Sequence, residues 1–275
     1  MKSSVSRLAL AFSASLAAAC TTAAAGTDDS AAAAPPATAA QERGAALTAA
    51  DADAFVTRAE HELGEFAVLN SRAQWVNATY ITPDTDALAA HFGTIGTEMG
   101  VRYATEAARY LEIPGLSDDT RRKLNILRSG LTLPAPTTAG AAAELNRIST
   151  DLSSQYGRGR GTMNGEQLTG NEIEARMGTV RNPAQLQEMW TSWNNNVGSP
   201  MRQDYARMVE IANAGARELG FEDTGAMWRS KYDMSPQEFE ALTERLWQEV
   251  QPLYQELHCF VRAGLNRRYG NSVQP

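Results

Sequence analysis

Residues 235–270, SPQEFEALTERLWQEVQPLYQELHCFVRAGLNRRYG, decide the fold. Ser235 and Glu238 have the spacing of a capping box, in which each side chain accepts a hydrogen bond from the other residue's backbone N–H. Pro236 suits the first helical position, where no N–H is needed. Apolar residues then recur every three or four positions, as on one face of a helix. They are Phe239, Leu242, Leu246, Val250, Leu253, Leu257, Val261 and Leu265.

This pattern predicts one helix over residues 236–269, about 50 Å long. Pro252 lies inside the helix and is expected to kink it, and Gly270 is expected to end it. An apolar stripe of this length needs a large body to cover it. The sequence ends at Pro275, so we expect part of that body to be missing from the chain, which should fold poorly alone.

The same helical spacing runs upstream as far as Ala50. Prolines and glycines divide it into segments, because proline restarts a helix and glycine ends one. The sequence therefore predicts an all-α fold. We expect helices over residues 51–80, 84–110, 117–131, 139–155, 183–190 and 200–219, and a long glycine-rich loop over residues 157–170.

Composition narrows the classes of function. Lysine and arginine number 25 and aspartate and glutamate 32, which gives a formal net charge of −7. Nucleic-acid binding needs a basic face, so we expect no nucleic-acid partner. Hydrophobic residues make up 43% and aromatic residues 7% of the chain, as in ordinary globular proteins. Collagen-like, disulfide-framework and polytopic membrane proteins are excluded.

The first fifty residues contain 20 alanines and cannot supply a hydrophobic core. Residues 1–20 read as an export signal: Lys2 and Arg7 precede a short apolar stretch, and small residues lead to Cys20. The apolar stretch is too short to span a bilayer. Residues 21–50 then form a disordered tether rich in Ala, Thr and Pro, and residues 51–275 form the helical domain.

Cys20 has two interpretations. The small residues before it resemble a bacterial lipobox, in which the cysteine is acylated, and this predicts a periplasmic or membrane-anchored lipoprotein. The alternative is ordinary signal cleavage after Ala17-Ala18-Ala19, with Cys20 incidental. The second cysteine, Cys259, lies beside Phe260 in the last helix, so we expect a buried free thiol and no structural disulfide.

No complete active site is present in the sequence. His61-Glu62-Leu63-Gly64-Glu65 is like a zinc-protease motif, but that chemistry needs a second histidine where Glu65 stands. A solvated helical face is the simpler interpretation. The glycine-rich run at residues 157–161 lacks a preceding strand and a Lys-Ser/Thr ending, so it favours a mobile surface loop over a phosphate site. We assign no catalytic or metal-binding residue.

Five tryptophan-rich or aromatic blocks carry a resemblance. Residues 71–75, 190–193, 226–232, 246–254 and 257–262 read SRAQW, WTSW, AMWRSKY, LWQEVQPLY and LHCFVR. Their order and spacing resemble the angiotensin-converting enzyme family of zinc peptidyl-dipeptidases. The resemblance implies a helical, cleft-divided fold whose first helices form a lid. It also implies zinc-dependent release of C-terminal dipeptides from oligopeptides, with the H-E-x-x-H ligands beyond residue 275.

The resemblance further implies chloride sites. Tyr232 matches the family tyrosine that helps to hold one activating chloride, and Trp190 and Trp228 match the apolar shell around the other. The family arginine of that second site is Asn194 here, and losing a guanidinium removes the main attraction for an anion. The family disulfide before the tryptophan region is absent as well.

Three hypotheses follow. In the first, the chain is the lid-bearing N-terminal section of an exported zinc peptidyl-dipeptidase and is inactive alone. In the second, it is a catalytically dead helical lipoprotein that binds peptides or partner proteins. In the third, it is a helical oligopeptidase of another zinc family, which fits the architecture but not the W-R-S-x-Y block at residues 228–232.

Overall fold

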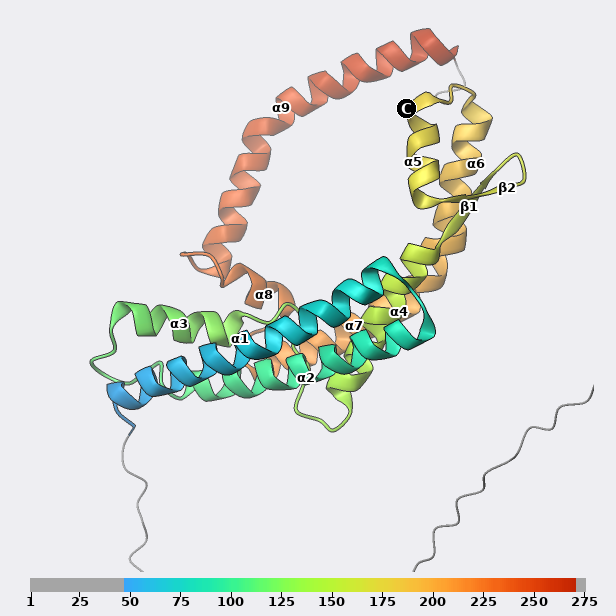
Figure 1. Ribbon diagram of the computed structural model, residues 1–275. Helices are drawn as coiled ribbons and strands as arrows, with labels where there is room; N and C mark the ends of the chain where they lie inside the picture. The colour runs from blue at the N-terminus through green and yellow to red at the C-terminus, as the bar shows by residue number, and fades with distance from the viewer. Residues whose placement is uncertain (1–46, 271–275) are drawn as a thin grey trace, which may run out of the picture. The chain divides into compact units, whose positions relative to one another are not determined.

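The computed structural model describes residues 47–270. Cys20, the predicted export signal and nearly all of the predicted tether lie outside the described residues and stay predictions. Figure 1 shows helices throughout the described part, interrupted by one small two-stranded hairpin. The predicted all-α fold class is confirmed.

The first three helices are α1 (Ala49–Thr79), α2 (Pro83–Ala108) and α3 (Asp118–Ser129). Each begins after a hydroxyl side chain that accepts a hydrogen bond from a backbone N–H of the first turn, and these are Thr48, Thr82 and Ser117. Such caps satisfy donors that have no partner inside the helix. The helices predicted over residues 51–80, 84–110 and 117–131 are confirmed.

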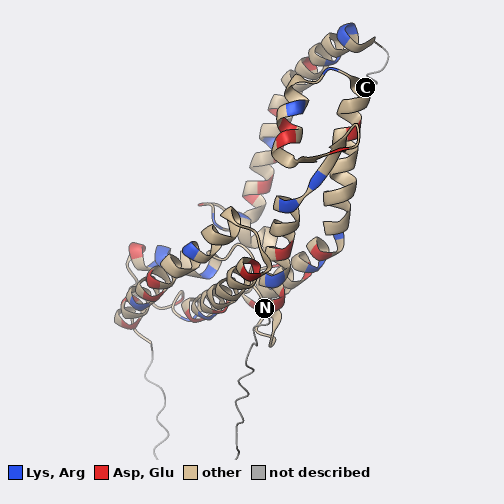
Figure 2. Cartoon of the chain, turned by 45° about the vertical axis from the view of Figure 1, so that its right-hand side comes forward, with Lys and Arg blue, Asp and Glu red and all other residues tan. Residues whose placement is uncertain are grey.

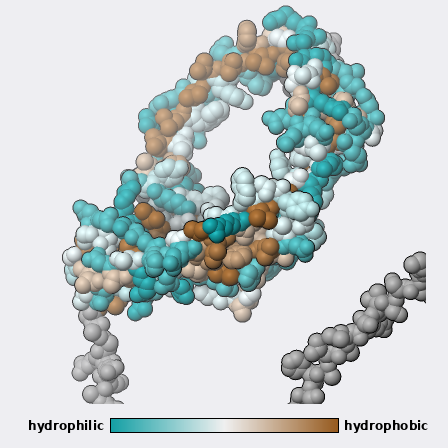
Figure 3. All heavy atoms as spheres, in the orientation of Figure 1, coloured by the Kyte–Doolittle hydropathy of each residue, from teal (hydrophilic) through white to brown (hydrophobic). Residues whose placement is uncertain are grey.

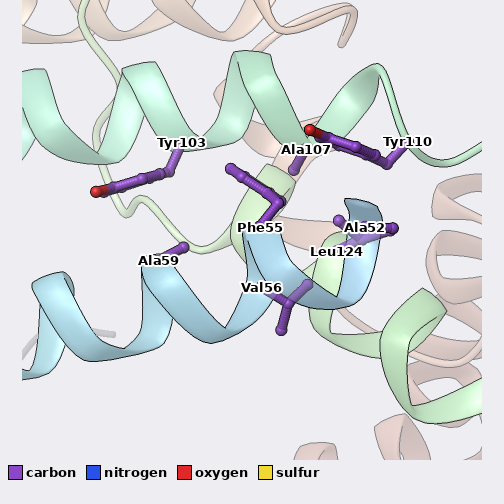
Figure 4. Close-up of a cluster of buried hydrophobic side chains, with 8 residues drawn as sticks. All are labelled: Ala52, Phe55, Val56, Ala59, Tyr103, Ala107, Tyr110 and Leu124. Carbon is purple, nitrogen blue, oxygen red and sulfur yellow. The ribbon is translucent and has the colours of Figure 1, made fainter. Parts of the chain in front are cut away.

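A cluster of buried apolar side chains holds these three helices together. Phe55 of α1 is fully buried and stacks on Tyr110, with ring centroids 5.0 Å apart. Tyr103 of α2 approaches the Phe55 ring from another side at 6.1 Å, and Leu124 of α3 completes the cluster. Figure 4 shows the Phe55 ring between α1 and α2, with the small side chains of Ala59 and Ala107 on these two helices.

A polar network joins α1 and α2 to α4 (Ala141–Arg158). Asp86 of α2 accepts hydrogen bonds from Asn77 Nδ2 at 2.7 Å, Ser154 Oγ at 2.5 Å and Arg158 Nη1 at 3.2 Å. Burial acts to raise the pKa of the Asp86 carboxyl, but these hydrogen bonds outweigh it and hold the pKa below its ordinary value. Asp86 is therefore a charged structural link between three helices.

The predicted long loop over residues 157–170 is wrong. The structure has α4 running to Arg158 and then a hairpin of β1 (Arg160–Met163) and β2 (Glu166–Thr169), paired antiparallel. Asn164 and Gly165 form the two-residue turn, with φ of 52° and 80°. Asn-Gly is the pair that tolerates positive φ at both central positions of a hairpin turn, and its presence was the overlooked signal.

After the hairpin come α5 (Gly170–Thr179), α6 (Pro183–Trp193) and α7 (Ser199–Glu218). Both α6 and α7 have the prolines near their first positions that the sequence analysis used to place them. Between α6 and α7 the backbone forms a π-helical segment, Asn194–Gly198, which was not predicted. Buried residues of α7 pack against those of α4, namely Met208 and Ile211 against Leu145, Ile148 and Leu152.

The chain continues through α8 (Thr224–Arg229) into α9 (Pro236–Tyr269). The predicted capping box of α9 is confirmed, because Glu238 N–H donates to Ser235 Oγ and Ser235 N–H to Glu238 Oε2. Figure 1 shows that α9 changes direction along its length, as expected for a helix with an internal proline. None of the residues of α9 is buried.

The exposure of α9 corrects one prediction. Cys259 is an exposed free thiol and not a buried one, because no element of the described chain covers that side of the helix. The predicted apolar stripe is exposed too, and Leu253 and Leu257 are 70% and 58% accessible. Figure 3 shows hydrophobic residues along the visible face of α9.

Charge is distributed along the helices without large regions of one sign. Figure 2 shows acidic and basic residues interspersed along most of them, which suits i,i+4 pairs such as Arg147 with Asp151 at 2.7 Å. Over residues 47–270, no helix combines the length and the apolar character needed to cross a membrane.

Candidate functional site

The chloride-site candidates lie on α6, on α8 and on the turn that follows α8. Trp190 is 61% exposed, Trp228 45% and Tyr232 53%. No aromatic contact joins Trp190 to Trp228 or Tyr232 within the described part of the chain. Trp228 and Tyr232 are four residues apart, in α8 and just after it, whereas Trp190 lies on α6.

The helix that carries Trp228 is held firmly in place. Asp223 caps α8 by accepting a hydrogen bond from Ala226 N–H at 2.7 Å. Met227 is completely buried against α2 and the end of α7. On the exposed side, the Trp228 indole N–H donates to the carbonyl of Thr132 at 2.7 Å. The position of Trp228 is therefore set by a specific hydrogen bond as well as by packing.

Tyr232 lies beside a groove of about 580 Å³ between α3 and the turn after α8. Its ring stacks on Phe239 of α9, with ring centroids 4.1 Å apart and an angle of 21° between the rings. The groove also contains Arg121, Arg128 and Lys231. No motif in the sequence marks the two arginines, although their spacing of seven places them on one face of α3.

The setting of Trp190 differs from that of its neighbour Trp193. Trp190 projects into solvent, and its carbonyl accepts a hydrogen bond from Asn194 Nδ2 at 2.8 Å. Trp193 packs edge-on against Tyr156 at 5.5 Å, and a Cβ at Gly170 would come within 2.9 Å of it. Trp193 is thus the structural tryptophan of the pair, and Gly170 permits its close approach.

The zinc-like run at residues 61–65 belongs to α1 and serves the fold. His61 Nε2 lies 3.7 Å from Glu65 Oε1, and both side chains are well exposed. Glu62 accepts a short hydrogen bond from the Tyr103 hydroxyl. Burial, together with this bond to Glu62, raises the pKa of Tyr103. Over residues 47–270, no three His, Cys, Asp or Glu side chains gather as a metal site.

Comparison with known proteins assigns the family. A family model described as angiotensin-converting enzyme matches residues 46–275, the whole helical part. The chain belongs to the angiotensin-converting enzyme family. The resemblance seen in the aromatic blocks is therefore confirmed, and the helical fold agrees with it. This is a zinc metallopeptidase family.

Individual relatives are longer than this chain. The angiotensin-converting enzyme of Rattus norvegicus is 30% identical over 207 residues, which cover 74% of this chain and 16% of the rat protein. The angiotensin-converting enzyme-like protein Ace3 of Mus musculus is also 30% identical over 207 residues, covering 74% of this chain and 28% of Ace3. The angiotensin-converting enzyme of Haematobia irritans exigua is 24% identical over 237 residues, covering 84% and 38%. The chain spans well under half the length of these relatives.

Neither the comparisons nor the geometry tests the individual site residues. Tyr232, Trp190 and Trp228 stay predictions for chloride, and Cys20 stays a prediction for lipidation.

Proposed function

We propose that this chain forms the N-terminal helical part of a zinc-dependent peptidyl-dipeptidase that releases C-terminal dipeptides from oligopeptides. The observation that carries the proposal is the family match over residues 46–275. The exposed apolar stripe of α9 supports it, because an uncovered stripe of this kind marks a surface that another polypeptide segment covers.

The role of the described residues is structural in this proposal. Residues 47–270 do not fit a zinc ion by themselves, since they bring no set of three metal-binding side chains together. We therefore assign no zinc ligand and no catalytic step to them. As the family resemblance implies, α1 and α2 would form part of a lid over the substrate channel, and the zinc ligands would come from other polypeptide.

The test uses protein purified from its native source and sized by mass spectrometry. A blocked tripeptide is the substrate, assayed with and without a zinc chelator, and the recombinant 275-residue chain is the matched control. We expect chelator-sensitive release of a C-terminal dipeptide from a native species longer than the recombinant control, which should be inactive. A native species that ends at Pro275 and releases no dipeptide would overturn the proposal and favour a catalytically dead, peptide-binding lipoprotein.

Export and chloride binding belong to the same proposal. We propose that residues 1–20 direct export and that Cys20 carries the lipid anchor, on the strength of the lipobox-like sequence. Incorporation of a labelled fatty acid that is lost in Cys20→Ala would support the anchor. The family resemblance alone supports a chloride contact at Tyr232, whose ring is 53% exposed and stacks on Phe239 of α9.

A further inference from the structure

The groove between α3 and the turn after α8 has an unusual charge for this acidic protein. Arg121, Arg122, Arg128 and Lys231 line it, against the carboxylates of Asp118 and Asp233. Four other large grooves in residues 47–270 carry at least as many carboxylates as cationic side chains. A local positive excess within a chain of net charge −7 favours an anionic ligand at this groove.

Most of these cations lack a carboxylate partner among the described residues. Arg121 Nη1 donates to the carbonyl of Leu111 at 3.0 Å, and Lys231 Nζ lies 3.5 Å from the carbonyl of Leu131. Arg122 alone pairs with an acid of the groove, at 3.3 Å, and both side chains of that pair are highly exposed. Because neutral carbonyls do not cancel a charge, the Arg121 and Lys231 charges stay uncompensated.

Arg128 has the most confined setting. Its guanidinium lies over the Phe221 ring at 4.9 Å, and its Nε is buried without a hydrogen-bond acceptor in the described residues. A buried donor that lacks an acceptor costs free energy. Elsewhere, arginines such as Arg176 form two hydrogen bonds to one carboxylate, at 2.7 and 2.8 Å. The Arg128 guanidinium is thus held against the Phe221 ring, and it forms no ion pair with a carboxylate among residues 47–270.

Apolar side chains line the same groove. Phe221, Ile126 and Tyr232 stand among the cations, and Ile126 and Tyr232 are 57% and 53% exposed. The volume of about 580 Å³ lies within the range of sites that hold small organic ligands. A bare inorganic anion would leave the apolar surface uncovered, whereas a peptide segment brings carboxylates and apolar side chains together.

We propose that this groove binds acidic peptide segments, with peptide carboxylates on Arg121, Arg128 and Lys231 and an apolar peptide side chain against Ile126 and Tyr232. Guanidinium–carboxylate hydrogen bonds are charge-assisted and directional, so they select acidic over neutral peptides. The binding needs no zinc and goes beyond the proposed hydrolysis, because all of the groove residues belong to this chain.

The test measures fluorescence anisotropy of a labelled short peptide of alternating Glu and Leu with the 275-residue chain. The comparison peptide has Gln in place of each Glu. We expect the acidic peptide to bind at least about tenfold more tightly, and its affinity to fall as salt screens the charges. Equal binding of the two peptides, or no binding of either, would overturn the proposal without affecting the proposed peptidase function.

Variants locate the binding. Arg121→Gln combined with Lys231→Gln removes two exposed cations of the groove, and Arg202→Gln combined with Arg217→Gln removes two exposed cations of α7 as the matched control. We expect the groove pair to weaken binding at least about tenfold and the control pair to change it little. Equal losses in both would indicate non-specific charge attraction and contradict the proposal. So would displacement of the acidic peptide by equimolar inorganic phosphate, which would indicate a simple anion site.

Discussion

The two long helices α1 and α9 have the same start and opposite surroundings. Both begin with a capping box. In α1, the side chains of Ala52, Phe55 and Ala59 are completely buried against α2 and α3. In α9, the longer apolar stripe buries nothing. Apolar spacing therefore predicts that a helix forms and which face is apolar, but burial depends on whether another element of the described chain lies against that face.

The difference changes what stabilises each helix. Burial of apolar surface stabilises α1, by about 25 cal/mol for each Å² removed from water. In α9 the visible contributions are local, such as Arg245 with Glu249 at 3.0 Å and Trp247 with Tyr254 at 5.6 Å. An i,i+4 ion pair contributes roughly 0.2–0.5 kcal/mol, and an aromatic pair contributes about 0.5–1.5 kcal/mol beyond its buried area. We therefore expect α9 to open more easily than α1 in this chain.

The largest expected effect comes from truncating one apolar side chain in each helix. Phe55→Ala should lower the free energy of unfolding by about 3–5 kcal/mol, because it leaves a cavity under Tyr103 and Tyr110. Leu253→Ala, at a 70% exposed position of α9, should change it by less than about 0.5 kcal/mol. Chemical denaturation followed by circular dichroism measures both. A loss at Leu253 comparable to that at Phe55 would show that α9 is covered in solution.

An intermediate effect should come from Asp86, the carboxylate that links α2 to α1 and α4. Asp86→Asn should lower the free energy of unfolding by about 1–3 kcal/mol, since it removes charge-assisted hydrogen bonds from Asn77, Ser154 and Arg158. Asp84→Asn is the control, because Asp84 lies in the same first turn and is exposed. Both substitutions remove a negative charge near the start of α2, so the difference between them measures the hydrogen bonds of Asp86 separately from the helix dipole.

The pH dependence of that effect has a definite sign. The folded-state pKa of Asp86 is below its ordinary value, so the unfolded chain binds the proton more tightly. The stability that the carboxylate provides is complete above the unfolded pKa of about 3.9 and is lost as the pH falls through the folded-state pKa. The difference in the free energy of unfolding between wild type and Asp86→Asn should thus shrink below about pH 4. A difference that grows on acidification would contradict this assignment.

The sequence predicted the helices because caps and prolines act locally. The helix starts at Thr82, Pro183 and Ser235 can be predicted from the local sequence, without the tertiary structure. The hairpin was not predicted because the glycines of this stretch were taken to indicate a loop. The Asn164-Gly165 pair, which indicates a hairpin turn, was not considered. The exposure of Cys259 could not be predicted, since it depends on what lies against α9.

The candidate sites were harder to predict for the same reason. The aromatic blocks indicated the family, which depends on residue order along the chain. The cationic groove brings α3 together with a turn about a hundred residues later, as the 3.3 Å ion pair between Arg122 and Asp233 shows. Only the structure could place Arg121 and Lys231 in one groove.

The smallest expected effect uses two helical glycines, each with room for a methyl group, to ask whether α1 and α9 unfold together. A Cβ at Gly64 of α1 meets no atom within 4 Å, and one at Gly264 of α9 meets only the end of the Arg267 side chain at 3.9 Å. Alanine favours a helix over glycine by about 0.5–1 kcal/mol. Gly64→Ala should therefore raise the global free energy of unfolding by that amount, whereas Gly264→Ala should slow hydrogen exchange in α9 and leave global unfolding unchanged. Equal global gains from both substitutions would mean that α9 unfolds with the core, and the contrast between the two helices would then lie in their surfaces alone.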